Sequence, residues 1–106
     1  MAWALLLAAG LLEVVWAFTM KLSHGFTRTG PAVVTLLAML ASFGLLSISM
    51  KTLPLGTAYT VWTGIGAVGA FLVGVVVLDE PLTTGRAIAA ALIVSGLLLM
   101  KMSTAS

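Results

Sequence analysis

The chain has 106 residues, of which 61% are hydrophobic and 8% charged, and its mean hydropathy is +1.23. Soluble domains are about half apolar and about a quarter charged, so the composition predicts an integral membrane protein, with residues 1–106 as its single domain. Cysteine is absent, which excludes disulfides, thiolate metal sites and cysteine nucleophiles. The five basic residues do not cluster, so a nucleic-acid-binding surface is excluded as well.

Four apolar segments follow one another along the chain, at residues 2–20, 31–50, 57–78 and 86–102. Each is close to the ~20 residues that cross about 30 Å of hydrocarbon as a helix. Barrel strands would be shorter and would alternate in polarity. We therefore predict an all-α membrane protein with four transmembrane helices. We do not expect the first segment to be a cleaved signal peptide, because it lacks a basic start and continues through Met20.

The first segment contains an acidic residue, Glu13, within the run GLLEVVW at residues 10–16. A carboxylate at bilayer depth costs about 2.5 to 3.5 kcal/mol, so it requires a partner, a proton or a function. We predict that Glu13 is functional. Trp16 lies on the same helix face and its indole can only donate, which makes the carboxylate a natural acceptor. Trp16 could instead be an interfacial anchor on the side of Lys21.

The second and third segments add polar and small side chains. Ser42, near the middle of the second segment, could serve helix packing or belong to the site, since a serine can satisfy itself by bonding a carbonyl one turn back. Tyr59 and Trp62 share a face of the third segment, and either form an interfacial belt or line a polar cavity. Gly64 and Gly66 could bend this helix. Alternatively, Gly66 and Gly69 or Ala70 form a close-packing surface.

The connections and the fourth segment are less informative. His24 lies in the polar first connection, and a solvated loop histidine is the better interpretation. In the fourth segment Ala87, Ala91 and Ser95 recur every four residues. Small residues at this spacing are typical of helix association, so we predict that they pack in a dimer.

Membrane orientation is not decided by the charges. One side holds Lys21, Arg28 and Arg86, and the other holds Lys51, Lys101 and the terminal amine. Four helices with one buried carboxylate leave little to enclose a substrate, so a dimer is expected. If its copies are antiparallel, a two-fold axis lies in the membrane plane, and the subunits can exchange inward and outward conformations.

Four stretches of the sequence resemble a known family. They are GLLEVVW at residues 10–16, KLSHGFTR at 21–28, ASF at 41–43 and KTLPLGTAYTVWTGIGA at 51–67. In this order, on four such segments, the chain resembles the small multidrug resistance family and, within it, the guanidinium exporters. The resemblance covers essentially the whole chain. The subtype depends mainly on Trp16 one turn after Glu13 and on KTLP preceding GTAYxxWTGIG.

The resemblance implies an antiparallel, dual-topology homodimer, multi-pass in the bacterial inner membrane, that exchanges protons for a cation. Glu13 is implied to bind both substrate and protons, while Trp16, Ser42, Tyr59 and Trp62 orient or line the site. Guanidinium is planar and its N–H fork matches a carboxylate. The expected function is proton-coupled export of guanidinium and small guanidinyl compounds, with cation and protons competing for two Glu13 carboxylates that titrate as a pair.

Two alternatives remain open at this stage. Export of quaternary ammonium cations would need a roomier apolar cavity and no bidentate pairing. A non-transporting membrane subunit would instead depend on shape and small-residue packing, so Glu13→Gln would leave its function intact. An enzyme is not expected, because no nucleophile, base and orienting group share a face. No cofactor or metal is predicted.

Overall fold

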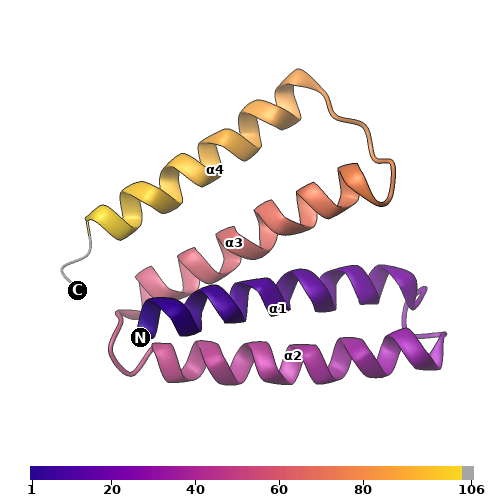
Figure 1. The fold of residues 1–106 in the computed structure, drawn as a ribbon, viewed down its shortest axis with the longest axis horizontal. Helices are drawn as coiled ribbons and strands as arrows, with labels where there is room; N and C mark the ends of the chain where they lie inside the picture. Colours follow the sequence, from indigo (N-terminus) through magenta and orange to yellow (C-terminus); the bar gives the residue numbers. More distant parts are fainter. Residues whose placement is uncertain (104–106) are drawn as a thin grey trace.

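The computed structural model describes residues 1–103, which form four α-helices joined by short connections (Figure 1). The helices are α1 (Ala2–Leu22), α2 (Thr29–Ser49), α3 (Leu55–Val76) and α4 (Thr84–Met102). Each has 19 to 22 residues, which at about 1.5 Å per residue approaches the thickness of the hydrocarbon layer. All four are long and apolar enough to cross a membrane. The predicted set of four spanning helices is therefore confirmed.

The helix ends lie within two residues of the predicted segments, and local chemistry explains the shifts. α2 begins before Pro31, because a residue without an N–H is tolerated in a first turn. α4 begins at Thr84, because the Thr83 hydroxyl accepts a hydrogen bond from the backbone N–H of Arg86 at 3.2 Å. After α3, Asp79 takes a φ of 57°, which turns the chain away from the helix axis.

The core of the protomer is built around α1, which lies between α2 and α3 (Figure 1). A Cβ on Gly10 would come within 2.5 Å of the Ile65 side chain, so glycine is needed for the close approach of α1 to α3. α1 and α2 are joined by a 2.6 Å hydrogen bond between the hydroxyls of Thr19 and Thr35. The three helices thus form one packed unit.

The fourth helix is attached more loosely. α4 packs along α3, none of its residues is buried, and it diverges from the other helices in Figure 1. Leu97 of α4 fits over Gly64 of α3, and the Lys101 ammonium lies 4.8 Å from the ring centroid of Trp3. The protomer measures 43 × 34 × 16 Å, so it is flat. Its exposed apolar side chains must be covered by lipid or by another protein.

Candidate functional site

Glu13 lies in α1 with its carboxylate against α3, where Gly66 leaves space for it. A Cβ on Gly66 would overlap the Glu13 carboxylate, so this position requires glycine if the arrangement is to be kept. The Oε1 atom of Glu13 is buried and has no hydrogen-bond partner within residues 1–103. Buried polar atoms are nearly always paired in folded proteins. This oxygen is therefore a candidate ligand atom.

Trp16 lies one turn further along α1, and its Nε1 is also buried without a partner in the described part of the chain. The hydrogen bond expected from this indole to Glu13 is therefore not formed. The Trp16 ring instead meets Phe43 of α2 edge-on, with centroids 6.3 Å apart and an interplanar angle of 73°. Helical spacing places two side chains on one face, but their χ angles decide whether they bond. An unpaired donor and an unpaired acceptor thus lie one turn apart.

Ser42 joins three helices through its hydroxyl. It is fully buried in α2, donates to the Ala9 carbonyl of α1 at 2.7 Å, and accepts from Trp62 Nε1 of α3 at 3.0 Å. These bonds between helices agree with the helix-packing alternative for Ser42, and its place in a binding site stays a prediction. Because its single proton is already donated, Ser42 positions Trp62 in this conformation.

Four aromatic side chains form a continuous row across α1, α2 and α3, here called the aromatic row: Trp16, Phe43, Trp62 and Tyr59. The Phe43–Trp62 and Tyr59–Trp62 centroids are each 5.7 Å apart. Trp62 is buried, whereas Tyr59 is 53% exposed and lies at the open end of the row. Aromatic faces attract cations, so the row could contact a positively charged substrate.

Phe43 was not predicted as a site residue, although it connects Trp16 to Trp62. The sequence contains a usable signal, because Phe43 is the one aromatic residue of α2 and follows Ser42 directly. Its role depends on contacts with two other helices, and helical periodicity within α2 does not predict those contacts.

The two glycines expected to bend α3 have packing roles. Gly64 accommodates Leu97 of α4, and Gly66 accommodates Glu13. α3 is continuous from Leu55 to Val76. A bend at these glycines therefore stays a prediction. The contact of Gly66 agrees with the close-packing alternative, whereas the packing of Leu97 on Gly64 was not predicted.

Two further predictions concern residues that do not contact Glu13 or the aromatic row. Ala87, Ala91 and Ser95 are exposed on α4, and the Ser95 hydroxyl donates to the Ala91 carbonyl at 2.8 Å. They are available to a partner helix, and their role in a dimer stays a prediction. His24 is exposed in the first connection with a φ of 50°.

Comparison with known proteins places this arrangement in a family. The model of the Small Multidrug Resistance protein family matches residues 1–93. The chain belongs to this family. The family predicted from the four sequence stretches is thus confirmed. The family match and the four spanning helices both indicate a multi-pass membrane protein.

Individual members of the family are similar over nearly their whole length. The guanidinium exporters of Citrobacter freundii and Salmonella typhimurium are each 53% identical over 104 residues, covering 98% of this chain and 99% of the relative. The guanidinium exporter of Yersinia pseudotuberculosis is 51% identical over 104 residues, covering 98% of this chain and 100% of the relative.

Proposed function

We propose that this chain exports guanidinium and small guanidinyl compounds in exchange for protons, and that Glu13 binds cation and protons in turn. The observation that carries the proposal is the unpaired, buried Glu13 oxygen beside the unpaired Trp16 indole. A buried acceptor without a partner fits a site that waits for a donor-rich ligand. The similarity to guanidinium exporters over 98% of the chain supports the choice of ligand.

The chemistry of guanidinium suits this site. The ion carries N–H donors in a planar fork, and a carboxylate accepts two of them in parallel, charge-assisted bonds. The aromatic row begins at Trp16, one helical turn after Glu13 in α1, and an aromatic face can contact the face of the ion. Protons compete for the same oxygens, so cation and proton exclude one another. Coupling of cation export to proton import then requires no separate proton pathway, provided that the protein changes between its inward and outward conformations only with a cation or protons bound.

We further propose that the working unit is an antiparallel, dual-topology homodimer in the bacterial inner membrane. A protomer only 16 Å thick leaves little to enclose a substrate, and a second copy would supply more. The exposed α4 stripe of Ala87, Ala91 and Ser95 offers a close-packing surface for the second copy. Each protomer would contribute one Glu13, Trp16, Ser42, Tyr59 and Trp62, and residues 1–106 would form a single membrane domain. No enzymatic activity and no cofactor are part of this proposal.

A second candidate is export of quaternary ammonium cations. The aromatic row favours it, because such cations bind aromatic faces without donating hydrogen bonds. The two candidates differ in one measurable property, namely whether the transported cation needs N–H groups.

The deciding experiment measures proton movement driven by a cation gradient across liposomes that contain the purified protein. Guanidinium is expected to drive protons, tetraethylammonium to drive few, and Glu13→Gln to abolish coupling. Asp79→Asn is the matched control, because it removes an exposed carboxylate from the third connection while leaving α1 unchanged. Coupling to tetraethylammonium alone would favour the second candidate. Coupling that survives in Glu13→Gln would refute the proposed site.

A further inference from the structure

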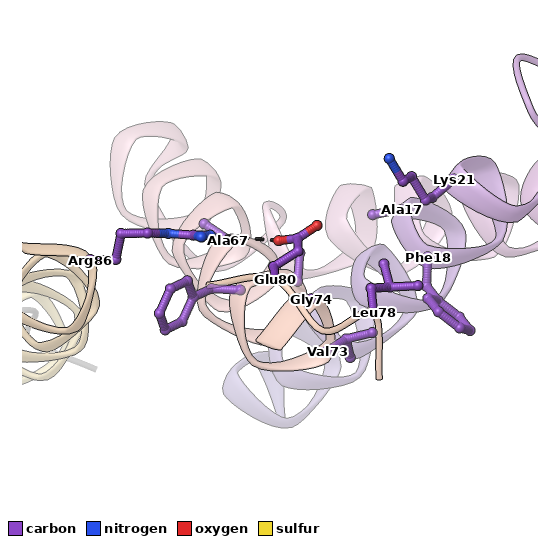
Figure 2. Close-up of a pocket in the computed structure, with 11 residues that line it drawn as sticks. Ala17, Phe18, Lys21, Ala67, Val73, Gly74, Leu78, Glu80 and Arg86 are labelled. Carbon is purple, nitrogen blue, oxygen red and sulfur yellow. Dashed lines mark ion pairs between the residues drawn. The ribbon is translucent and has the colours of Figure 1, made fainter. Parts of the chain in front are cut away.

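A cavity separate from the Glu13 cluster opens at the end of the protomer that holds the first and third connections (Figure 2). Its volume is about 330 Å³, and it lies between α1 and α3. The charged side chains at this cavity are Lys21, Glu80 and Arg86, and in Figure 2 Glu80 lies between the two basic residues. The walls below the rim are apolar. A carboxylate therefore lies at the mouth of a mostly apolar cavity.

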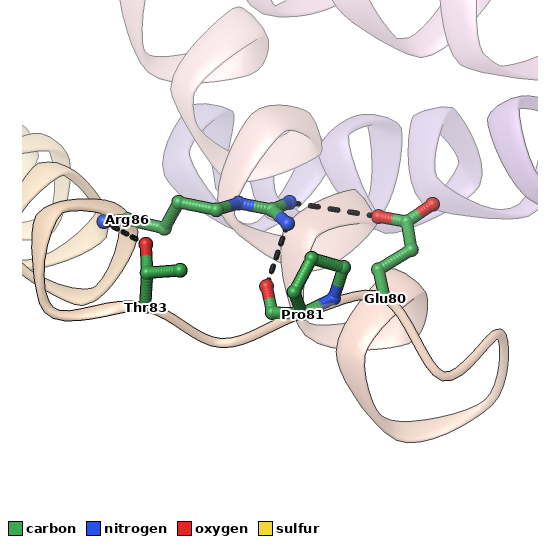
Figure 3. A network of polar contacts seen from close by, with 4 residues as sticks. All are labelled: Glu80, Pro81, Thr83 and Arg86. Carbon is green, nitrogen blue, oxygen red and sulfur yellow. Dashed lines mark hydrogen bonds and ion pairs between the residues drawn. The ribbon is translucent and has the colours of Figure 1, made fainter.

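The third connection already binds a guanidinium group, which is that of Arg86 (Figure 3). Arg86 Nη1 donates to the Pro81 carbonyl at 2.6 Å, and Nη2 lies 3.5 Å from Glu80 Oε1. Its guanidinium carbon is 5.2 Å from the ring centroid of Phe71 on α3. A carboxylate, a carbonyl and an aromatic face are the three kinds of group that a planar, donor-rich cation needs.

The Glu80 carboxylate is fixed in place by the backbone. The Glu80 N–H donates to the Gly74 carbonyl at 2.9 Å, and the carboxylate lies so close to Gly74 that a Cβ there would overlap it. Asp79, with its φ of 57°, turns the chain back over the end of α3. The backbone of Glu80 is therefore held against the end of α3, with the carboxylate close to Gly74.

The ion pair between Arg86 and Glu80 is partly exposed to solvent. The two side chains are 39% and 40% exposed, and ion pairs at such exposure contribute little to stability. The cavity also extends inward to Ala17 and Ala70, each one helical turn beyond Glu13 and Gly66. A cation held at the mouth would thus lie at the end of the α1–α3 seam that contains Glu13.

We propose that Glu80, the Pro81 carbonyl and Phe71 form an outer binding site for guanidinium-type cations, which the Arg86 side chain occupies at rest. Free guanidinium displaces Arg86, so Arg86 acts as a tethered competitor. The role of this site in transport rests on the proposed function, because the outer site would bind the same cation that Glu13 binds. Lys21 on the opposite side of Glu80 opposes cation binding through its charge.

Binding at the outer site can be measured without transport. The backbone N–H signals of Asp79, Glu80, Leu82 and Thr83 would be followed by NMR in bicelles during a guanidinium chloride titration. Sodium chloride and tetramethylammonium chloride at equal ionic strength serve as comparisons. Glu13→Gln is present in every sample, so the inner site does not contribute. The full chain is used throughout.

The Arg86→Ala variant is expected to show a saturable change at these signals with guanidinium alone. If Arg86 occupies the site nine-tenths of the time, its removal lowers the apparent Kd about tenfold relative to the same chain with Arg86. Adding Glu80→Gln should abolish the change. Lys21→Ala should tighten binding further, because it removes a repelling charge. Arg28→Ala is the matched control, since it removes an exposed arginine of the first connection.

Several outcomes would overturn the inference. Equal changes with sodium or tetramethylammonium would show that the site does not recognise guanidinium. Changes that persist in Glu80→Gln would place binding elsewhere. If Arg86→Ala disturbs the whole spectrum, Arg86→Lys takes its place, because lysine keeps the charge but lacks the fork, and it should also lower the apparent Kd. An unchanged Kd in Arg86→Lys would then refute the tethered competitor.

Transport provides an independent comparison with Glu13 intact. Arg86→Ala is expected to lower the guanidinium concentration that gives half-maximal proton movement, and Arg86→Ala with Glu80→Gln should reverse this change. If the wild-type chain moves no protons with guanidinium, the proposed function fails while the NMR result still stands. If transport is normal but the NMR changes are absent, the outer site fails alone.

Discussion

Replacing Ser42 by alanine would remove the hydroxyl that links α1, α2 and α3. In the structure this hydroxyl donates to the Ala9 carbonyl at 2.7 Å and accepts from Trp62 Nε1 at 3.0 Å, and Ser42 is fully buried. The variant leaves the Trp62 N–H without an acceptor. The Ala9 carbonyl is less affected, because it lies inside α1 and retains its helical hydrogen bond.

The size of the effect follows from these two partners. A buried donor left unpaired costs about 1–3 kcal/mol, whereas single side-chain hydrogen bonds within membranes average about 0.6 kcal/mol with a maximum near 1.7. We expect Ser42→Ala to lower the free energy of unfolding by about 2 kcal/mol. In a Trp62→Phe background no N–H is left unpaired, so the same change should cost about 0.5 kcal/mol. The difference between the two values is the coupling between Ser42 and Trp62.

The assay is equilibrium unfolding by sodium dodecyl sulfate in mixed micelles, followed by tryptophan fluorescence and circular dichroism. Protein concentration is held constant, because association would change the apparent stability. Ser47→Ala is the control, since Ser47 is an exposed serine of the same helix and should change stability by less than about 0.5 kcal/mol. Equal losses from Ser42→Ala in both backgrounds would refute the reasoning, because the Trp62 N–H would then carry none of the cost.

Three further predictions concern the site and its support. Gly66→Ala should reduce coupled transport at least about tenfold by displacing the Glu13 carboxylate from α3, whereas Gly44→Ala, which has open space at its Cβ, should not; equal flux in liposomes would contradict this. Thr35→Val should lower the free energy of unfolding by about 1 kcal/mol, because the hydroxyl bonded to Thr19 is lost, and an unchanged unfolding curve would refute it. Because protons and guanidinium compete for Glu13, the apparent Kd for guanidinium should rise as pH falls, by up to about tenfold per pH unit for each proton displaced, and a Kd independent of pH in binding titrations would exclude a shared site.

The fold could be predicted in outline because membrane thickness sets helix length. Each apolar segment gave one helix, and the ends shifted by no more than two residues, where Pro31 and Thr83 determine the first turns of α2 and α4. Hydropathy does not encode such local capping chemistry, so the exact ends of the helices required the structure.

The site could be predicted in part. Glu13 was identified from its cost in the bilayer, and Trp16 from its spacing. Three features depend on rotamers and on contacts between helices. They are the missing Trp16–Glu13 hydrogen bond, the hydrogen bond from the Trp62 N–H to Ser42, and the contacts of Phe43. Periodicity within one segment constrains neither rotamers nor contacts between helices. The sequence therefore indicated candidate site residues but not the hydrogen bonds and ring contacts among them.

The loose attachment of α4 has a consequence for biosynthesis. Since α4 contributes no buried residue, the α1–α3 unit can reach its packed state before the fourth helix has left the insertion machinery. The association surface proposed above then lies on a helix that is inserted after α1, α2 and α3. If the proposed dimer forms through α4, membrane insertion and assembly are separable steps, and a newly inserted protomer keeps this surface available until a second copy reaches it.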